Sequence, residues 1–260
     1  MHPVILQIGP FTIYSFGLMV ALGLLAAAYV TSLEFRRIGL DADLVPGLTF
    51  WAAVGGIGGA RLFLIFEEPD KFLADPLAVL FSGAGFVWYG GFFGGLAAAL
   101  AFIRRHNLPI LRVLDCVAPA LPLGHAIGRI GCHLAGDGDW GTVTTLPWGV
   151  AYQKAIIGWP HPAGVVVHPT PIYEAIAYTL IFAFLWARRT RSDGDGTQLW
   201  LYLVLAGIAR FAVEFVRINR PWVLGLTLAQ WTSLLLILVG TIFLLNPRMV
   251  TRLASPANRK

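Results

Sequence analysis

The chain has 260 residues, of which 57% are hydrophobic and 13% are charged, and its mean hydropathy is +0.71. Soluble domains are roughly 45–50% apolar and 25% charged, so this composition excludes a soluble protein and indicates an integral membrane protein. The net charge of +5 does not indicate nucleic acid binding, because the basic residues form short clusters between apolar segments. Metal-ligand spacings, a Walker sequence and a dinucleotide-binding glycine motif are absent from the sequence. We therefore expect no metal and no cofactor.

Apolar segments recur along the chain at the length of about 20 residues that a helix needs to cross a bilayer. They lie at 12–33, 45–66, 84–103, 113–134, 171–188, 198–217 and 227–246. The sequence predicts an all-α integral membrane protein with about seven transmembrane helices. Residues 1–250 are expected to form one polytopic membrane domain, and residues 251–260 a short basic tail. Glycine-rich stretches near 55–59 and 90–95 leave open whether two of the spans are broken or re-entrant.

Basic clusters predict the orientation. Twelve of the nineteen basic residues fall in every second connection and in the tail, namely Arg36, Arg37, Arg104, Arg105, Arg112, Arg188, Arg189, Arg191, Arg248, Arg252, Arg259 and Lys260. The positive-inside rule makes that side cytoplasmic. The N-terminus is then expected outside and the C-terminus in the cytoplasm. The connection 135–170, rich in Gly, Pro and Trp, becomes an extracytoplasmic insertion with a short strand or hairpin near Val165–Val167.

The second and third predicted spans carry the first candidate site residues. Arg61 follows Gly58-Gly59-Ala60, and Tyr89 stands before Gly90, Gly91 and Gly94 at the outer end of the third span. Backbone N–H groups at a glycine-rich helix start favour anions. The alternative is that the glycines form a packing face for another helix and that the tyrosine is an ordinary interfacial aromatic.

The fourth span ends in Gly128-Arg129-Ile130-Gly131-Cys132-His133-Leu134-Ala135-Gly136-Asp137. Small residues beside Arg129 let a helix or a lipid headgroup approach the backbone closely. The candidate binding residues here are Arg129, Cys132, His133 and Asp137. The alternative is an arginine that extends its guanidinium group to the membrane surface from a helix end.

The fifth and sixth spans carry the remaining candidates. His168, Tyr173 and Glu174 enter the fifth span, as an ordinary helix start or as a polar cluster at the depth of the arginines. Arg210, Glu214 and Arg217 are spaced i, i+4 and i+7, so they share one helical face. That face predicts a salt-bridge ladder, which is compatible with a phosphate site.

Three arginines, Arg61, Arg129 and Arg210, thus lie in or at the edge of predicted spans. An arginine at the bilayer centre costs roughly 2.5–3.5 kcal/mol, so three would cost on the order of 9 kcal/mol unless paired or hydrated. The planar guanidinium group matches phosphate oxygens and keeps its charge when desolvated. The pattern favours a protein that handles phospholipids.

Taken together, these segments resemble the bacterial prolipoprotein diacylglyceryl transferase family. The similarity covers nearly the whole chain and rests on Ile13–Gly17, Gly59-Ala60-Arg61, Gly90-Gly91-x-x-Gly94, Gly128-Arg129-Ile130-Gly131, Pro147-Trp148, His168-Pro169-Thr170, Tyr173-Glu174, Arg210-Phe211-x-x-Glu214-Phe215-x-Arg217 and Gln230. The resemblance implies a seven-helix enzyme of the bacterial inner membrane, with its active site toward the outer leaflet. It implies transfer of the diacylglyceryl group of phosphatidylglycerol to the lipobox cysteine in the signal peptide of a preprolipoprotein, with release of glycerol phosphate. The expected partners are therefore phosphatidylglycerol, the preprolipoprotein and the bilayer.

Within that resemblance, Arg129 and Arg210 are expected to stabilise the departing phosphate, with Glu174, Glu214 and Arg217 in support. Tyr89 stands where the family commonly has a histidine, and a phenol with a reference pKa of about 10 is a poorer base than imidazole. The proton acceptor is therefore open between Tyr89, which the sequence favours, and His133 or His168. Cys132 stands where the family often has asparagine.

Two other classes of function are compatible with the sequence. A family member without catalysis would only bind lipids or lipoprotein precursors, and Tyr89 is the main support for this reading. A transporter of anionic lipids would use the same arginines, although the sequence lacks a detectable inverted repeat, which many transporters show.

Overall fold

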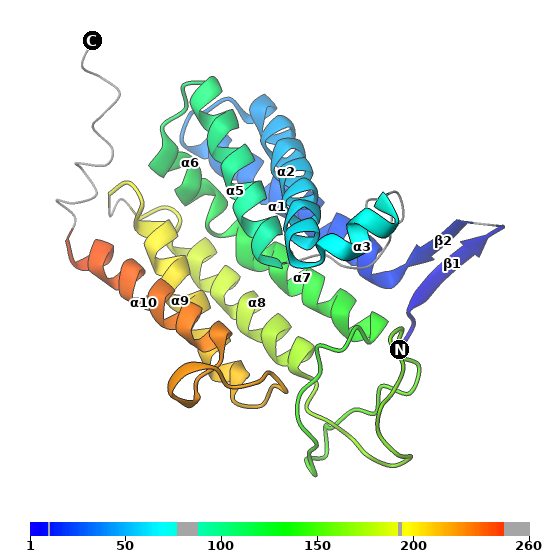
Figure 1. The fold of residues 1–260 in the computed structure, drawn as a ribbon. Helices are drawn as coiled ribbons and strands as arrows, with labels where there is room; N and C mark the ends of the chain where they lie inside the picture. Colours follow the sequence, from blue (N-terminus) through cyan, green and yellow to red (C-terminus); the bar gives the residue numbers. More distant parts are fainter. Residues whose placement is uncertain (10, 77–87, 192–193, 247–260) are drawn as a thin grey trace. The chain divides into compact units, whose positions relative to one another are not determined.

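The computed structural model describes residues 1–9, 11–76, 88–191 and 194–246. In chain order the elements are β1 (Val4–Ile8), β2 (Phe11–Tyr14), α1 (Ser15–Arg37), η1 (Ala42–Leu44), α2 (Val45–Glu67), α3 (Pro69–Ala74), α5 (Trp88–Arg105), α6 (Ile110–Val117), α7 (Ala120–Ala135), α8 (Thr170–Arg188), α9 (Thr197–Glu214), η2 (Val223–Gly225) and α10 (Leu228–Leu245) (Figure 1). The chain divides into two compact units. Unit 1 comprises Met1–Thr31 with Leu114–Lys260, and unit 2 comprises Ser32–Val113.

Five helical segments are long and apolar enough to cross a membrane: Ser15–Arg37, Ala42–Glu67, Ile110–Ala135, Thr170–Arg188 and Leu228–Leu245. The protein is therefore a mostly helical, multi-pass membrane protein, as predicted. The predicted span 84–103 overlaps α5 from residue 88 onward, and its residues 84–87 lie outside the described part of the chain. The predicted span 198–217 overlaps α9, and neither α5 nor α9 is among the five. Four glycines and two arginines lower the hydropathy of α5, and the charged residues Arg210 and Glu214 lower that of α9. The count of seven spans stays a prediction.

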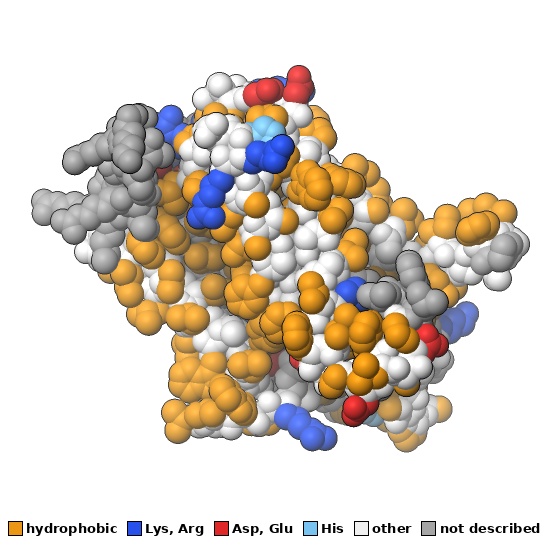
Figure 2. Space-filling model, turned by 45° about the horizontal axis from the view of Figure 1, so that its top comes forward, with side chains coloured by type: hydrophobic (Ala, Val, Ile, Leu, Met, Phe, Trp, Pro, Cys, Tyr) orange, Lys and Arg blue, Asp and Glu red, His pale blue; other side chains and the backbone are white. Residues whose placement is uncertain are grey.

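Large apolar side chains on the candidate spans face outward, as lipid contact requires. Leu22, Leu180 and Leu235 are 43%, 65% and 58% exposed. Hydrophobic side chains also dominate the face seen in Figure 2. The fourth predicted span is two helices, α6 and α7. Pro119 stands between them, and a proline has no N–H to continue a helical ladder.

Unit 1 is built around α7, α8, α9 and α10. Its core contains Ala126, Tyr178, Ile181, Leu185 and Ala206, against which Leu201, Tyr202, Leu205 and Ala209 pack. Small residues bring the backbones together, since a Cβ on Gly207 would lie 2.9 Å from the Ser233 carbonyl oxygen. A Cβ on Gly23 of α1 would likewise lie 2.9 Å from the Gly124 carbonyl oxygen of α7. The contact between Gly23 and Gly124 positions α7, the helix that carries Arg129.

Unit 2 contains a closely packed pair of helices, α2 and α5. A Cβ on Gly59 would lie 2.2 Å from the Gly90 carbonyl oxygen, and one on Gly94 would lie 2.3 Å from the Gly55 carbonyl oxygen. No side chain fits at these distances, so the glycines are required by the helix contact. Both helices run without a break through their glycine-rich stretches.

The N-terminal hairpin was not predicted, because residues from 12 onward were assigned to the first span. Phe11–Tyr14 instead pairs antiparallel with Val4–Ile8, and α1 begins at Ser15. Isoleucine, valine and threonine suit a strand, and Gly9 supplies a positive φ of 58° before the second strand. The His2 N–H donates to the Leu134 carbonyl oxygen over 3.1 Å, which ties the hairpin base to the end of α7.

The segment between α7 and α8 has only isolated β-bridges where a strand or hairpin was expected. Val167 bridges both Val143 and Val150 and is buried with Trp140 and Tyr152. Packing of this small, largely aromatic core therefore holds the segment together more than hydrogen bonds between paired strands do. Its predicted place outside the membrane stays a prediction, as does the single-domain assignment. The predicted tail 251–260 lies outside the described residues.

Candidate active site

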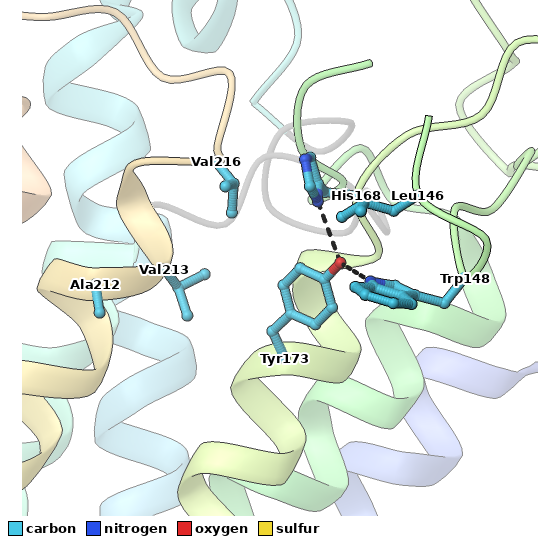
Figure 3. Close-up of a pocket in the computed structure, with 7 residues that line it drawn as sticks. All are labelled: Leu146, Trp148, His168, Tyr173, Ala212, Val213 and Val216. Carbon is cyan, nitrogen blue, oxygen red and sulfur yellow. Dashed lines mark hydrogen bonds between the residues drawn. The ribbon is translucent and has the colours of Figure 1, made fainter. Parts of the chain in front are cut away.

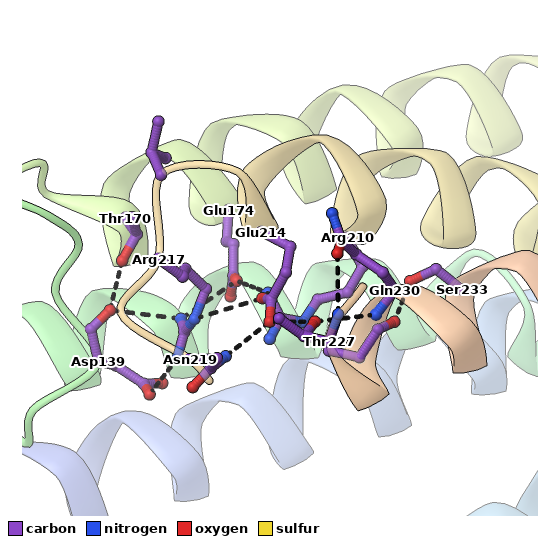
Figure 4. Close-up of polar contacts among 12 residues, drawn as sticks. Asp139, Thr170, Glu174, Arg210, Glu214, Arg217, Asn219, Thr227, Gln230 and Ser233 are labelled. Atoms are coloured by element: carbon purple, nitrogen blue, oxygen red, sulfur yellow. Dashed lines mark hydrogen bonds and ion pairs between the residues drawn. The ribbon is translucent and has the colours of Figure 1, made fainter. Parts of the chain in front are cut away.

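Three arginines and three acids of unit 1 form one ion-pair network. Figure 4 shows two of the arginines, Arg210 and Arg217, with the three acids. The arginines are Arg129 on α7, Arg210 on α9 and Arg217 just after α9, and the acids are Asp139, Glu174 and Glu214. Their formal charges balance, three against three. Each guanidinium group is paired with carboxylates, and these ion pairs offset the free-energy cost of placing arginines in or beside apolar helices.

Glu174 is the centre of this network. It is 1% exposed and contacts all three arginines: its Oε2 pairs with the Arg129 Nε, and its Oε1 lies 3.2 Å from the Arg210 Nη1 and 3.4 Å from the Arg217 Nη1. Glu174 is the fifth residue of α8 and one of the buried residues of that helix. The predicted convergence of Glu174 with Arg129 and Arg210 is confirmed.

Glu214 links α9 to the start of α10. Its Oε2 lies 2.8 Å from the Arg210 Nη1, while its Oε1 accepts from the Thr227 hydroxyl over 2.6 Å and from the Asn219 Nδ2 over 2.8 Å. Thr227 is also the N-cap of α10 in a capping box with Gln230. The predicted ladder on α9 is thus present, and it is extended by residues from two further segments.

Asp139 joins the network from the segment after α7. Its carboxylate pairs with Arg129, and its Oδ1 accepts from the Arg217 Nη2 over 2.5 Å. Burial alone would raise the pKa of Asp139, but the charges and hydrogen bonds of Arg129 and Arg217 outweigh it and hold that pKa below the ordinary value. Asp139 is consequently ionised at neutral pH.

The segment that carries Asp139 is fastened to α8 and to the end of α9. The Thr170 hydroxyl donates to the Asp139 carbonyl oxygen, and the Gly141 N–H donates to the His168 carbonyl oxygen over 2.8 Å. A Cβ on Gly141 would lie 2.2 Å from the Val216 carbonyl oxygen. This glycine therefore permits the close approach that brings Asp139 to the arginines.

Asp137 and Cys132 adjoin the network. Ligand-type atoms of Cys132, Asp137 and Asp139 all lie within 4.8 Å of one another. Among the residues that the structure describes, this is the set with a spacing suited to a metal ion. Both oxygens of Asp139 already bind guanidinium groups, however, so the set fits an ion-pair network better than a cation site.

An apolar pocket of about 470 Å³ borders the same ends of α8 and α9 (Figure 3). Its lining residues are Leu146, Trp148, His168, Tyr173, Ala212, Val213 and Val216. The Trp148 Nε1–H donates to the Tyr173 hydroxyl over 2.8 Å, and that hydroxyl lies 3.1 Å from the His168 Nδ1. His168 and Tyr173 therefore meet each other at the pocket and do not appear in the ion-pair contacts of the network.

Among the other predicted site residues, His133 lies in the last turn of α7 in unit 1, where its Nδ1 is 2.9 Å from the Tyr152 hydroxyl. The rest lie in unit 2. Arg61 is buried in α2, and Tyr89 is half-buried in the first turn of α5. Gly90 and Gly94 face the backbone of α2, and a Cβ on Gly91 would lie 3.4 Å from the Gly56 carbonyl oxygen. The structure gives the glycines a packing role. A role of these residues in binding stays a prediction.

Sequence reasoning missed several members of the site. Asp139 follows Asp137 by two residues in Gly-Asp-Gly-Asp, and no pattern distinguishes which acid turns toward the arginines. His125 stands one helical turn before Arg129, accepts from its Nε over 3.3 Å and stacks on Tyr178 at 3.9 Å between ring centroids. The i, i+4 spacing was the available signal for His125. Asn219 and Thr227 had none.

Comparison with known proteins identifies the family of the chain. The family model for prolipoprotein diacylglyceryl transferase matches residues 3–246. A phosphatidylglycerol–prolipoprotein diacylglyceryl transferase of Clostridium tetani is 34% identical over 95% of this chain and 97% of its own length. Proteins with the same name from Chromohalobacter salexigens and Bordetella bronchiseptica are 34% and 31% identical over 89% and 96% of this chain, and over 85% and 97% of their own lengths. The resemblance predicted from the motifs is confirmed: the chain belongs to the prolipoprotein diacylglyceryl transferase family.

Proposed function

We propose that this enzyme transfers the diacylglyceryl group of phosphatidylglycerol to the cysteine thiol of a prolipoprotein, forming a thioether and releasing glycerol phosphate. The names of the relatives contain both substrates. The observation in the structure that supports this activity is the cluster of Arg129, Arg210 and Arg217 around Glu174. Guanidinium groups in a water-poor site are the donors that best stabilise a departing phosphate.

Arg129 and Arg210 are the better placed of the three to receive the phosphate. Their side chains are 16% and 21% exposed, whereas that of Arg217 is 8% exposed. Arg217 is also held through Asp139 on two sides, at the carboxylate and at the carbonyl oxygen. We therefore assign phosphate binding to Arg129 and Arg210, and the positioning of the acids to Arg217.

Phosphate entry requires ion pairs to be exchanged. The Oε2 atoms of Glu174 and Glu214 and the Nε of Arg217 are buried and lack a well-aligned hydrogen bond, although each lies in an ion pair. Ion pairs with poor alignment are weaker than bidentate ones. A phosphate that makes aligned hydrogen bonds with Arg129 and Arg210 can replace these Oε2 contacts, while Asp139 still pairs with Arg129 and the Glu174 Oε1 still pairs with Arg210.

The remaining site residues of the proposal lie in unit 2, and there it rests on the family resemblance. Arg61, Gly90, Gly91 and Gly94 are proposed to assist lipid binding, and Tyr89 to contribute to the transfer reaction. We further propose the bacterial inner membrane as the location, with seven spans, the N-terminus outside and the C-terminus in the cytoplasm. Cysteine reporters at 140–165 should then react with an impermeant outside reagent, and reporters at 104–112 should not. Labelling of the second set alone would reverse this orientation.

The proposed activity is tested directly by incubating the purified protein with phosphatidylglycerol and a peptide that contains a lipobox cysteine. The peptide should gain the mass of one diacylglyceryl unit, and glycerol phosphate should be released in equal amount. A protein that binds the lipid without any mass gain would be a binding member of the family. Movement of lipid between vesicle leaflets without mass gain would indicate a transporter.

A further inference from the structure

Transfer to a thiol needs a proton acceptor near the arginines, and the two histidines considered from sequence are otherwise engaged. The His133 Nδ1 lies 2.9 Å from the Tyr152 hydroxyl, and the His168 Nδ1 lies 3.1 Å from the Tyr173 hydroxyl. The Tyr173 hydroxyl also accepts from the Trp148 Nε1–H. Each histidine therefore uses one ring nitrogen to hold a tyrosine.

Asp137 has a different environment. Gly136 caps α7 in the left-handed conformation, with a φ of 63°, and turns the chain back on the last helical turn. The Asp137 carboxylate consequently lies within 4.8 Å of the Cys132 Sγ and of an oxygen of Asp139. Asp139 in turn binds Arg129 and Arg217. Asp137 thus lies next to Asp139, which in turn pairs with Arg129, one of the two arginines proposed to bind the phosphate.

Asp137 is the acid of this region that is not committed to an arginine. Glu174, Glu214 and Asp139 each pair with two or three guanidinium groups. Across the described parts of the chain, no arginine lies within ion-pair distance of Asp137. Its contacts are the Asp139 N–H, which donates to its Oδ1 over 3.3 Å, and the Cys132 thiol.

We propose that Asp137 is the proton acceptor for the prolipoprotein thiol, an inference that rests on the proposed function. The Cys132 Sγ lies within 4.8 Å of an oxygen of this carboxylate, so the structure shows that a thiol can be accommodated beside it. The carboxylate takes the S–H proton as the sulfur forms a bond to the glyceryl carbon. The bond from that carbon to the phosphate oxygen breaks, and its electron pair leaves with glycerol phosphate toward Arg129 and Arg210. Asp137 then returns the proton to the departing phosphate or to water.

The charges around Asp137 suit this role. Burial raises its pKa, and the neighbouring Asp139 charge also raises it, while the Cys132 hydrogen bond and Arg129 lower it, with a net increase above the ordinary value of 3.8. The Asp137 charge also acts on Tyr152: burial, and then this charge, raise the pKa of that phenol. A carboxylate with a raised pKa is a stronger base toward a thiol, whose reference pKa is about 8.5.

The test is Asp137→Asn, which keeps the size of the side chain and its acceptor oxygen. The rate of thioether formation in a single turnover at pH 7 should fall by about 10²–10⁴-fold, while the Kd for phosphatidylglycerol vesicles stays the same. As pH rises toward 9, the peptide thiol ionises by itself. The difference between wild type and Asp137→Asn should therefore shrink by about tenfold per pH unit below the thiol pKa, which the loss of a purely structural group would not produce.

Stability provides a second readout with the opposite sign. A carboxyl group whose pKa is raised on folding binds more protons in the folded state, so its charge reduces the free energy of unfolding above that pKa. At pH 7, Asp137→Asn should therefore keep or raise the unfolding temperature while it removes activity. Asp70→Asn, at an exposed acid in the first turn of α3, is the matched control and should change neither property.

Three outcomes would overturn the proposal. Asp137→Asn with a rate within threefold of wild type would exclude Asp137 as the base. Loss of phosphatidylglycerol binding would make it a binding residue. The transfer rate of Tyr89→Phe, His133→Gln or His168→Gln could instead approach the wild-type rate at high pH while that of Asp137→Asn does not. That result would assign the proton acceptor to the residue changed in that variant. Failure of the wild-type protein to transfer lipid at any pH would instead contradict the proposed function itself.

Discussion

The two units use polar and small residues in opposite ways, although the sequence suggested anion binding in both. In unit 1, Arg129, Arg210 and Arg217 meet three acids from three separate segments. In unit 2, Gly59 and Gly94 bring two helices into backbone contact. A buried charge demands partners, so its surroundings follow from electrostatics. A glycine only removes a side chain, and what fills the space depends on the neighbouring helix.

The largest expected effect is that of Glu174→Gln. This change leaves three arginines without their shared carboxylate, and removing one partner of a buried pair costs about 3–5 kcal/mol. We expect a marked drop in the unfolding temperature in detergent and no measurable transfer activity. Glu174→Asp, which keeps the charge, is the control and should recover part of the stability. Normal stability of Glu174→Gln would show that the network is not held by its central acid.

Gly94→Ala tests the other side of the comparison. The added Cβ would meet the Gly55 carbonyl oxygen at 2.3 Å, so overpacking should cost about 1–3 kcal/mol. Gly58→Ala is the matched control, because its Cβ would meet no atom within 4 Å, and a helical Gly→Ala change is worth up to about 1 kcal/mol in stability. The measurement is thermal unfolding with lipid binding. Unchanged stability of Gly94→Ala with lost lipid binding would favour a ligand role over packing.

Thr227→Val should have an intermediate effect. It removes the hydroxyl that donates to Glu214 over 2.6 Å and that caps α10. The loss of an N-cap costs about 1 kcal/mol, and a hydrogen bond to a charged group about 1.5–3 kcal/mol. Thr227→Ser keeps both contacts and is the control. If the two variants unfold at the same temperature, the Thr227 hydroxyl at the start of α10 does not help to hold Glu214 in place.

The smallest expected effect is the loss of stability at low pH. The pKa of Asp139 is depressed, so its contribution to the free energy of unfolding is present above the ordinary value of 3.8 and is lost as pH falls through its folded-state pKa. Unfolding temperatures of wild type should therefore decline below about pH 4. Asp139→Asn should lower the unfolding temperature at neutral pH, and its unfolding temperature should decline less steeply below about pH 4 than that of wild type. The same slope in both proteins would assign the acid sensitivity to other carboxyl groups.

Much of the fold follows from local sequence. Apolar runs located all seven predicted segments at helices, and the spacing of Arg210, Glu214 and Arg217 predicted their shared face. The hairpin was missed because Phe11–Tyr14 contains two large apolar residues and runs directly into the span that follows it. Asp139 was missed because its place depends on contacts with Thr170 and with the end of α9, far away in the chain. Long-range contacts of this kind leave no periodicity to read.

The most direct test of the phosphate role assigned to the arginines is the transfer rate of Arg129→Lys. Lysine keeps the positive charge beside Glu174 and Asp139 but loses the planar fork that binds two phosphate oxygens. With phosphatidylglycerol and a cysteine peptide, the folded variant should release glycerol phosphate about 10²–10³-fold more slowly than wild type, at a similar unfolding temperature. Equal rates in the two folded proteins would contradict the assignment of Arg129 to the phosphate.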